Sequence, residues 1–216
     1  MHRRGNRFGA ILLIGGLACL TLVPFTFYLV VSLCPVQIHG LSLARVTGDV
    51  VDPATNVSVP VKVTVGPSGG CMWYNTTHAP TRCIAKIPFV PDADLLHLPS
   101  NQTLTRSFPI AMGRALALNH VMTALCGLSL LAVLLDILVL HGGVSYILVQ
   151  LAVIMMWITF VFETTYISVL HKRLNDNNSG FEYHIGPTYW MILAATIAVS
   201  LLMCSNGSVE VSVNND

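Results

Sequence analysis

Four long apolar runs constrain what this chain can fold into more than any other feature of its sequence. Each run has few or no charges, and each is long enough to cross most of a hydrocarbon core of about 30 Å as an α-helix. They cover residues 9–33, 117–140, 144–170 and 188–204. The predicted fold class is therefore an all-α transmembrane four-helix bundle, with the polar segments between the runs lying on either side of the membrane.

The composition agrees with a membrane protein and excludes one class of partner. Of the 216 residues, 54% are hydrophobic and only 10% are charged, against about 25% charged in soluble domains. The net charge of +1 creates no basic field for nucleic acid. The expected partners are the lipid bilayer and other membrane proteins, a second copy of the chain included, and no cofactor is expected.

Charges near the first run predict the orientation. Residues 1–8 contain Arg3, Arg4 and Arg7, and basic residues favour the cytoplasmic side. A cleaved signal peptide is the alternative, but the apolar run is about twice as long as a usual signal core. We therefore expect a multi-pass membrane protein with both termini cytoplasmic. The outer segments are then residues 34–116 and 171–187, and the inner ones are residues 1–8, 141–143 and 205–216.

The long polar segment contains a strand pattern. Valines alternate with polar residues from Val57 to Val65, and this period of two is typical of a strand with one buried face. Residues 36–46 form a second candidate strand, and residues 52–56 offer a turn between the two. We predict a small extracellular antiparallel β-sheet.

The same segment contains the predicted disulfide. Three of the six cysteines lie inside apolar runs, and Cys34 lies at a membrane edge, which leaves Cys71 and Cys83. Disulfides form in oxidising compartments. A zinc site that includes His78, between these cysteines, is the rival interpretation, but the spacing lacks the pairs typical of zinc ligands. No metal site is predicted.

Acceptor motifs for N-glycosylation accompany the outer segments. Three of them, at Asn75, Asn101 and Asn177, fall where the predicted topology is extracellular. Short motifs of this kind also arise by chance. Together they predict a glycosylated outer face.

Ionisable residues inside the apolar runs need an explanation, because they are costly in lipid and face the interior of a bundle. Glu163 and His120 are expected near the outer end of their helices, whereas Asp136 is expected near the cytoplasmic end. We therefore predict an intramembrane polar pair of His120 and Glu163. A proton or ion relay is the alternative use of the same residues. The sequence contains no familiar enzyme motif, so no catalytic residue is predicted.

Several short motifs resemble a known family. They comprise a proline-led stretch that follows the first run, a glycine and cysteine pattern in the outer segment, and the starts or ends of the later runs. The motifs are Pro35-Val36-Gln37-Ile38, Leu41-Ser42-Leu43, Gly66, Gly70-Cys71 with Cys83, Ala115-Leu116-Ala117-Leu118-Asn119-His120, Phe160-Val161-Phe162-Glu163 and Gly186-Pro187-Thr188-Tyr189-Trp190. The chain thereby resembles the claudin-like tetraspan superfamily, and within it the fungal family of PalI and eisosomal Sur-type membrane proteins.

The resemblance implies a claudin-like fold and a non-enzymatic role. That role is the organisation of a plasma-membrane domain or cell-surface assembly, through lateral helix contacts and the outer loop. An accessory subunit of a membrane receptor in ambient pH sensing is the alternative, and a channel or transporter is the third option.

Overall fold

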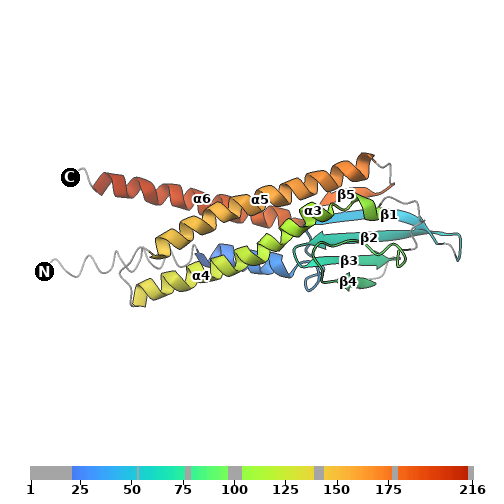
Figure 1. Cartoon of the computed structure of the whole chain (residues 1–216), viewed down its shortest axis with the longest axis horizontal. Coiled ribbons are helices and arrows are strands. Elements are labelled where there is room, and N and C mark those ends of the chain that lie inside the picture. The colour runs from blue at the N-terminus through green and yellow to red at the C-terminus, as the bar shows by residue number, and fades with distance from the viewer. Residues whose placement is uncertain are drawn as a thin grey trace.

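The molecule is elongated, with a β-sheet at one end and helices that extend away from it (Figure 1). The computed structural model describes residues 21–52, 54–75, 79–96, 104–138, 144–176 and 180–213. An N-terminal helix, Thr21–Leu33, leads into the sheet. The chain then leaves the sheet along one long helix, returns along a second and leaves again along a third.

Five antiparallel strands form the sheet, in the order β4-β3-β2-β1-β5. The first four follow one another along the chain, and the fifth comes from the segment between the last two long helices. Their bounds are β1 Ala44–Val51, β2 Ser58–Gly66, β3 Gly69–Tyr74, β4 Arg82–Ile84 and β5 Glu182–Ile185. The segment between α5 and α6 thus completes a sheet that the long polar segment begins.

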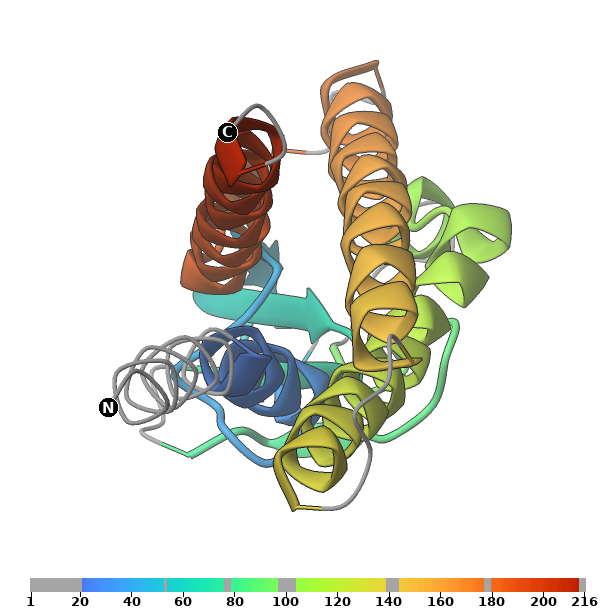
Figure 2. The same ribbon diagram turned by 90° about the vertical axis from the view of Figure 1, so that its left-hand side faces the viewer.

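Three long helices and three short helical turns make up the rest of the described fold. The short ones, α2 Leu104–Ser107, α3 Ile110–Gly113 and the 3-10 turn η1 Arg114–Ala117, lead into the first long helix. The long ones are α4 Leu118–Leu138, α5 Val144–Asp176 and α6 Pro187–Val213. Seen along its length, the molecule has α4 and α5 lying together, with α6 on the other side of α5 (Figure 2).

Two hydrophobic cores hold these elements together. In the first, valines of β1 and β2 pack against the last turns of α5, where Tyr166, Ile167 and Leu170 are buried. In the second, Tyr28 of the N-terminal helix meets side chains of α4, α5 and α6. The sheet is therefore packed directly on the helices and shares a core with them.

The predicted fold class, an all-α four-helix transmembrane bundle with a minor sheet, was wrong. Within the described residues two helices, Ile110–Leu135 and Ser145–Asp176, are long and apolar enough to cross a membrane. The apolar helices Thr21–Leu33 and Pro187–Ser200 are shorter. Moreover, the sheet has five strands. The physical reason for the error is that residues 171–187, predicted as an outer loop, supply both the end of α5 and strand β5.

Predictions from local sequence patterns in the polar segment were more accurate than the predicted fold class. The alternating valines do form β2, and it pairs with β1 through a turn after Asp52. In that turn Asn56 has a φ of 53°, a conformation that asparagine tolerates. The predicted strand at 36–46 was largely wrong, because β1 begins only at Ala44. The predicted turn at 141–143 lies outside the described residues.

Candidate functional site

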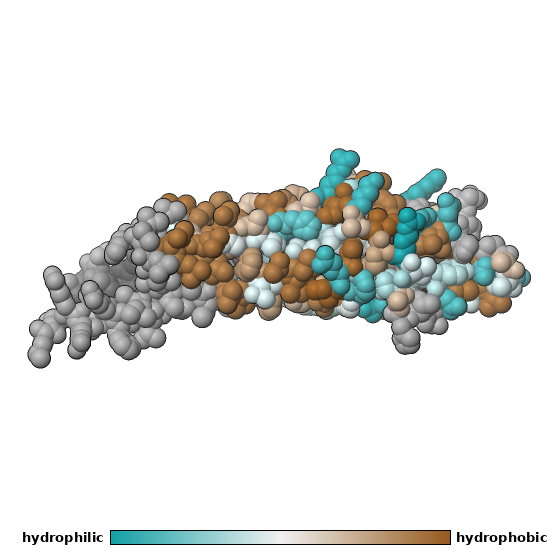
Figure 3. Space-filling view, turned by 90° about the horizontal axis from the view of Figure 1, so that it is seen from below, coloured by the Kyte–Doolittle hydropathy of each residue, from teal (hydrophilic) through white to brown (hydrophobic). Residues whose placement is uncertain are grey.

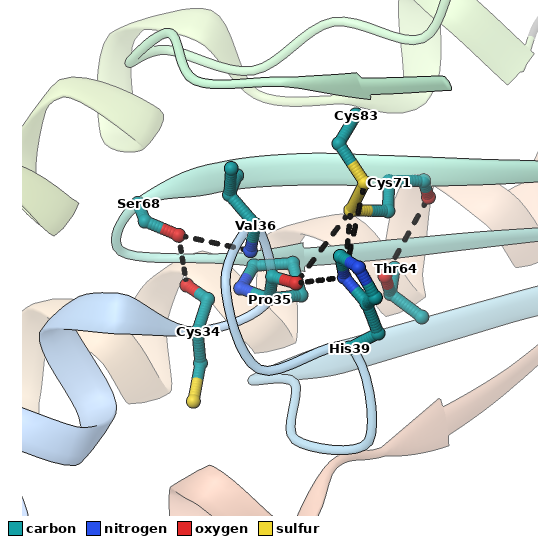
Figure 4. Close-up of a disulfide and its surroundings, with 8 residues drawn as sticks. All are labelled: Cys34, Pro35, Val36, His39, Thr64, Ser68, Cys71 and Cys83. Carbon is teal, nitrogen blue, oxygen red and sulfur yellow. Dashed lines mark hydrogen bonds between the residues drawn. A yellow bond between two sulfur atoms is a disulfide. The ribbon is translucent and has the colours of Figure 1, made fainter. Parts of the chain in front are cut away.

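The segment that joins the N-terminal helix to the sheet is fixed to the turn between β2 and β3. The Ser68 hydroxyl donates to the Cys34 carbonyl at 2.6 Å, and the Ser68 amide donates to the same oxygen at 3.0 Å (Figure 4). The Val36 amide donates in turn to the Ser68 hydroxyl at 3.2 Å. These bonds hold the residues after Cys34 over the outer face of the sheet, which is the face turned away from α5.

Beneath this segment lies the disulfide between Cys71 of β3 and Cys83 of β4. The two residues stand directly opposite each other in the strand register. Cys71 is buried and Cys83 is partly buried. The predicted disulfide is confirmed, and its place in the fold shows that it ties the short edge strand β4 to the sheet.

The side chain of His39 lies against this disulfide. Its Nδ1 is 3.8 Å from the Cys71 sulfur and 3.9 Å from the Cys83 sulfur, and it lies 2.9 Å from the Pro35 carbonyl oxygen (Figure 4). Because a carbonyl only accepts, Nδ1 carries a proton in that bond. His39 itself is exposed to solvent. One imidazole and two sulfurs therefore meet at the surface of the sheet.

Sequence reasoning missed His39, because it weighed only the histidine between the two cysteines. That residue, His78, lies outside the described residues, whereas His39 is 32 positions before Cys71. No local spacing signals such a contact. Only the return of residues 34–41 over β3 brings His39 to the sulfurs, and the bonds of Ser68 are the observation that explains it.

A second polar site lies where α4 and α5 cross. The Asn119 side-chain amide donates to a Glu163 carboxyl oxygen at 2.5 Å, and Glu163 is only 1% exposed. His120 is exposed on a different side of α4. The predicted pair of His120 and Glu163 was therefore wrong. Neighbouring residues on a helix differ in direction by about 100°, so an error of one position exchanges a buried partner for an exposed one.

This second site also joins the N-terminal helix to the bundle. The Thr123 hydroxyl lies 2.9 Å from the Asn119 carbonyl and 3.0 Å from the Tyr28 carbonyl. One side-chain oxygen each of Asn119 and Glu163 is buried without a hydrogen-bond partner among the described atoms. Asp136 is in the part of α4 far from the sheet, and its side chain lies outside the described set.

An open hollow of about 690 Å³ marks the outer face of the sheet, and residues of β1, β2 and β3 line it. The Lys62 ammonium lies 4.4 Å above the Trp73 ring, a cation–π arrangement. Burial first, and the neighbouring Arg45 second, lower the pKa of Lys62. Asp49 and Glu182 lie on the rim, so this face presents both signs of charge around an aromatic ring.

The three predicted glycosylation sites are described only in part. Asn75 is exposed at the end of β3, with a φ of 62°. The two threonines that complete its motif lie outside the described residues, as do Asn101 and Asn177. The structure therefore leaves glycosylation as a prediction.

A comparison with models of protein families found none that matches this chain, and a comparison with curated proteins found no match either.

Proposed function

We propose that this chain is a non-enzymatic integral membrane protein that organises a cell-surface assembly. Helices α4 and α5 cross the plasma membrane, and the sheet stands outside the cell. Lateral contacts of the helices and the outer face of the sheet bring other membrane proteins, or further copies of the chain, together.

The observation that carries this proposal is the exposure of large apolar side chains along the helices. Leu131 of α4 is 57% exposed, and Ile147 and Val161 of α5 are 67% and 58% exposed. In each candidate span only 28% of the apolar window is buried inside the protein. A core helix of a water-soluble protein buries most of such a window, and monomeric soluble proteins rarely expose large contiguous apolar patches.

The polar surface lies elsewhere. Hydrophobic residues dominate the described helices, and hydrophilic ones gather toward the sheet (Figure 3). This separation supports a molecule with one end in water and the remainder in lipid. The Cys71–Cys83 disulfide and the exposed Asn75 favour an extracellular rather than a cytoplasmic position for the sheet. The opposite ends of α4 and α5 then face the cytoplasm.

A role in assembly is favoured by which polar groups the fold leaves accessible. Among the described residues, one group of three potential metal ligands converges, and two of its members are joined in a disulfide. The Asn119–Glu163 pair links two helices and is closed to solvent. By contrast, the hollow around Lys62 and Trp73 is open, which suits contact with another protein.

The first test asks whether the chain is embedded in the membrane. The tagged full chain is expressed in a eukaryotic cell, and membranes are washed with alkaline carbonate. The chain should stay in the membrane pellet and enter solution only with detergent. Glycosidase treatment should increase its gel mobility, with an Asn75→Gln variant as the control. Release of the chain by carbonate would overturn the proposal.

The second test concerns assembly. Photobleaching of the fluorescent chain in living cells should reveal a slowly exchanging population, and proximity labelling should mark a constant set of membrane proteins. A single-span protein with a similar tag serves as the freely diffusing control. Diffusion at the rate of that control, with no enriched neighbours, would contradict an organising role.

A further inference from the structure

We propose that Cys71, Cys83 and His39 form a binding site for a thiophilic divalent cation, Zn²⁺, when the disulfide between the two cysteines is reduced. The disulfide and the metal are then alternative links at one position of the sheet. This inference needs only the sheet and the segment that covers it, so it does not depend on the proposed role in the membrane.

The distances carry the proposal. In a tetrahedral zinc site, with Zn–S near 2.3 Å and Zn–N near 2.0–2.1 Å, a nitrogen ligand lies about 3.6 Å from each sulfur. His39 Nδ1 lies 3.8 Å and 3.9 Å from the two sulfurs. All three ligand atoms lie within 4.8 Å of one another. The imidazole therefore already has the spacing of a ligand, and only the two sulfurs have to separate.

The surroundings offer a fourth ligand. The Pro35 carbonyl oxygen lies 3.6 Å from the Cys71 sulfur and 2.9 Å from His39 Nδ1. A water is the other option, because His39 is exposed and Cys83 only partly buried. Sites with three protein ligands and one open position are common for zinc. Hence the cluster provides two soft thiolates, one imidazole and access from solvent.

The position of His39 is fixed by the fold as well as by the disulfide. The bonds of Ser68 to the Cys34 carbonyl and to the Val36 amide do not involve sulfur. They hold the start of the segment that carries His39 against the β2–β3 turn after reduction. A site held in place by its surroundings binds metal more tightly than three groups on a free chain.

The reaction balances with an external dithiol as the reductant. One thiolate of the dithiol attacks the more accessible Cys83 sulfur, and Cys71 leaves as a thiolate that takes up a proton. The second thiol of the reductant then releases Cys83, and the reductant becomes a cyclic disulfide. When Zn²⁺ binds, both cysteine thiols lose their protons, and the proton of His39 Nδ1 is exchanged through solvent to Nε2.

The other buried thiol near this segment does not compete. The Cys34 sulfur points away from the Cys71–Cys83 disulfide (Figure 4). It donates to the Val30 carbonyl at 3.0 Å. Cys34 therefore lies outside the group of His39, Cys71 and Cys83.

The test uses the full chain in detergent micelles and Co²⁺ as a spectroscopic probe for the zinc site. The reduced protein, freed of reductant, should bind one Co²⁺ with a thiolate-to-cobalt charge-transfer band, and Zn²⁺ should displace it. The oxidised protein should show no such band. His39→Ala should weaken binding by at least 10–100-fold, a range that the loss of an outer-shell partner already causes. His120→Ala is the matched control and should bind like the wild type.

Three outcomes overturn the proposal. The first is a charge-transfer band of equal strength and affinity in His39→Ala and in the wild type. The second is the absence of the band in reduced protein whose circular dichroism still shows the sheet. The third is a band that appears only after the sheet signal is lost. Because His39→Ala leaves the disulfide in place, this variant folds in the oxidised state before reduction.

Discussion

The sheet buries most of its large apolar side chains inside the protein, whereas the long helices expose many of theirs on the surface. In the sheet, Val46 and Val63 are buried against α5, and the lining of the hollow includes the charged residues Asp49, Lys62 and Glu182. In the helices, Leu131 and Ile147 point away from the protein. Water stabilises the first arrangement through the hydrophobic effect, whereas the second requires surroundings as apolar as the side chains themselves. The two regions therefore respond differently to the same kind of substitution.

The largest effect is expected at the turn between β2 and β3. Gly69 has a φ of +133°, and a Cβ there would meet the backbone of Ile84, Ala85 and Lys86. Gly69→Ala should lower the free energy of unfolding by about 3–5 kcal/mol, from backbone strain plus overpacking. Denaturation followed by circular dichroism measures it. Gly40→Ala, where a Cβ meets nothing within 4 Å, should change stability by less than about 0.5 kcal/mol.

The next prediction compares the two regions directly. Leu131 and Val51 are 57% and 56% exposed, one on α4 and the other at the end of β1. Leu131→Arg should cost about 3 kcal/mol in a bilayer, and Val51→Arg should cost less than about 0.5 kcal/mol. The fraction of each variant that stays in carbonate-washed membranes is the measurement. Equal behaviour of the two variants would contradict a lipid environment for α4.

The disulfide should matter to the sheet alone. It closes a sequence separation of 12 residues, for which chain entropy predicts about 2–3 kcal/mol. The double variant Cys71→Ala and Cys83→Ala should lose this amount when denaturation is followed by the fluorescence of Trp73 and the other tryptophans. Wild-type protein in metal-free reducing buffer should lose a similar amount. An unchanged midpoint in both experiments would show that the link adds nothing to stability.

A smaller effect is expected where α4 meets α5. Asn119→Ala removes the only hydrogen bond described for the buried Glu163 side chain and should cost about 2 kcal/mol. Thermal unfolding in lipid nanodiscs measures it. His120→Ala, one position away on the exposed side, should cost less than about 0.5 kcal/mol. The reverse ranking would restore the pair predicted from sequence.

The smallest effect concerns the hollow on the sheet. Lys62→Ala removes the cation above Trp73 and should cost about 0.5–1 kcal/mol. Lys62→Arg should retain most of this, because arginine also stacks on aromatic rings. Lys86→Ala, an exposed lysine near β4, is the control. Indistinguishable denaturation midpoints for all three variants would mean that the contact contributes nothing measurable to stability.

The sequence was sufficient where the signal is local. The alternating valines predicted β2, because a period of two reveals a strand with one buried face. The pair Cys71 and Cys83 was found because the remaining cysteines lie in or next to apolar runs. Both features depend on residues close together along the chain. Both the strand and the disulfide can therefore be predicted without knowledge of the rest of the fold.

Features that depend on distant contacts were missed. Residues 182–185 have a short and unremarkable strand signal, and they become β5 because β1 offers an unpaired edge. Similarly, the partner of Glu163 depends on the rotation of α4 about its axis, which apolar residues on nearly every side of the helix do not specify. His39 reaches the disulfide only through the path of residues 34–41. Tertiary structure decided each of these cases.

The pairing of Ala44 with Ile185 has a consequence for biosynthesis. Proteins are made from the N-terminus, so β1 to β4 emerge and can fold while α4 and α5 are still being synthesised. Until the ribosome has passed residue 185, β1 has a free edge with unpaired amides and carbonyls, which invites pairing with other chains. A chaperone that covers this edge should therefore associate with nascent chains that end before β5, and dissociate from those that include it.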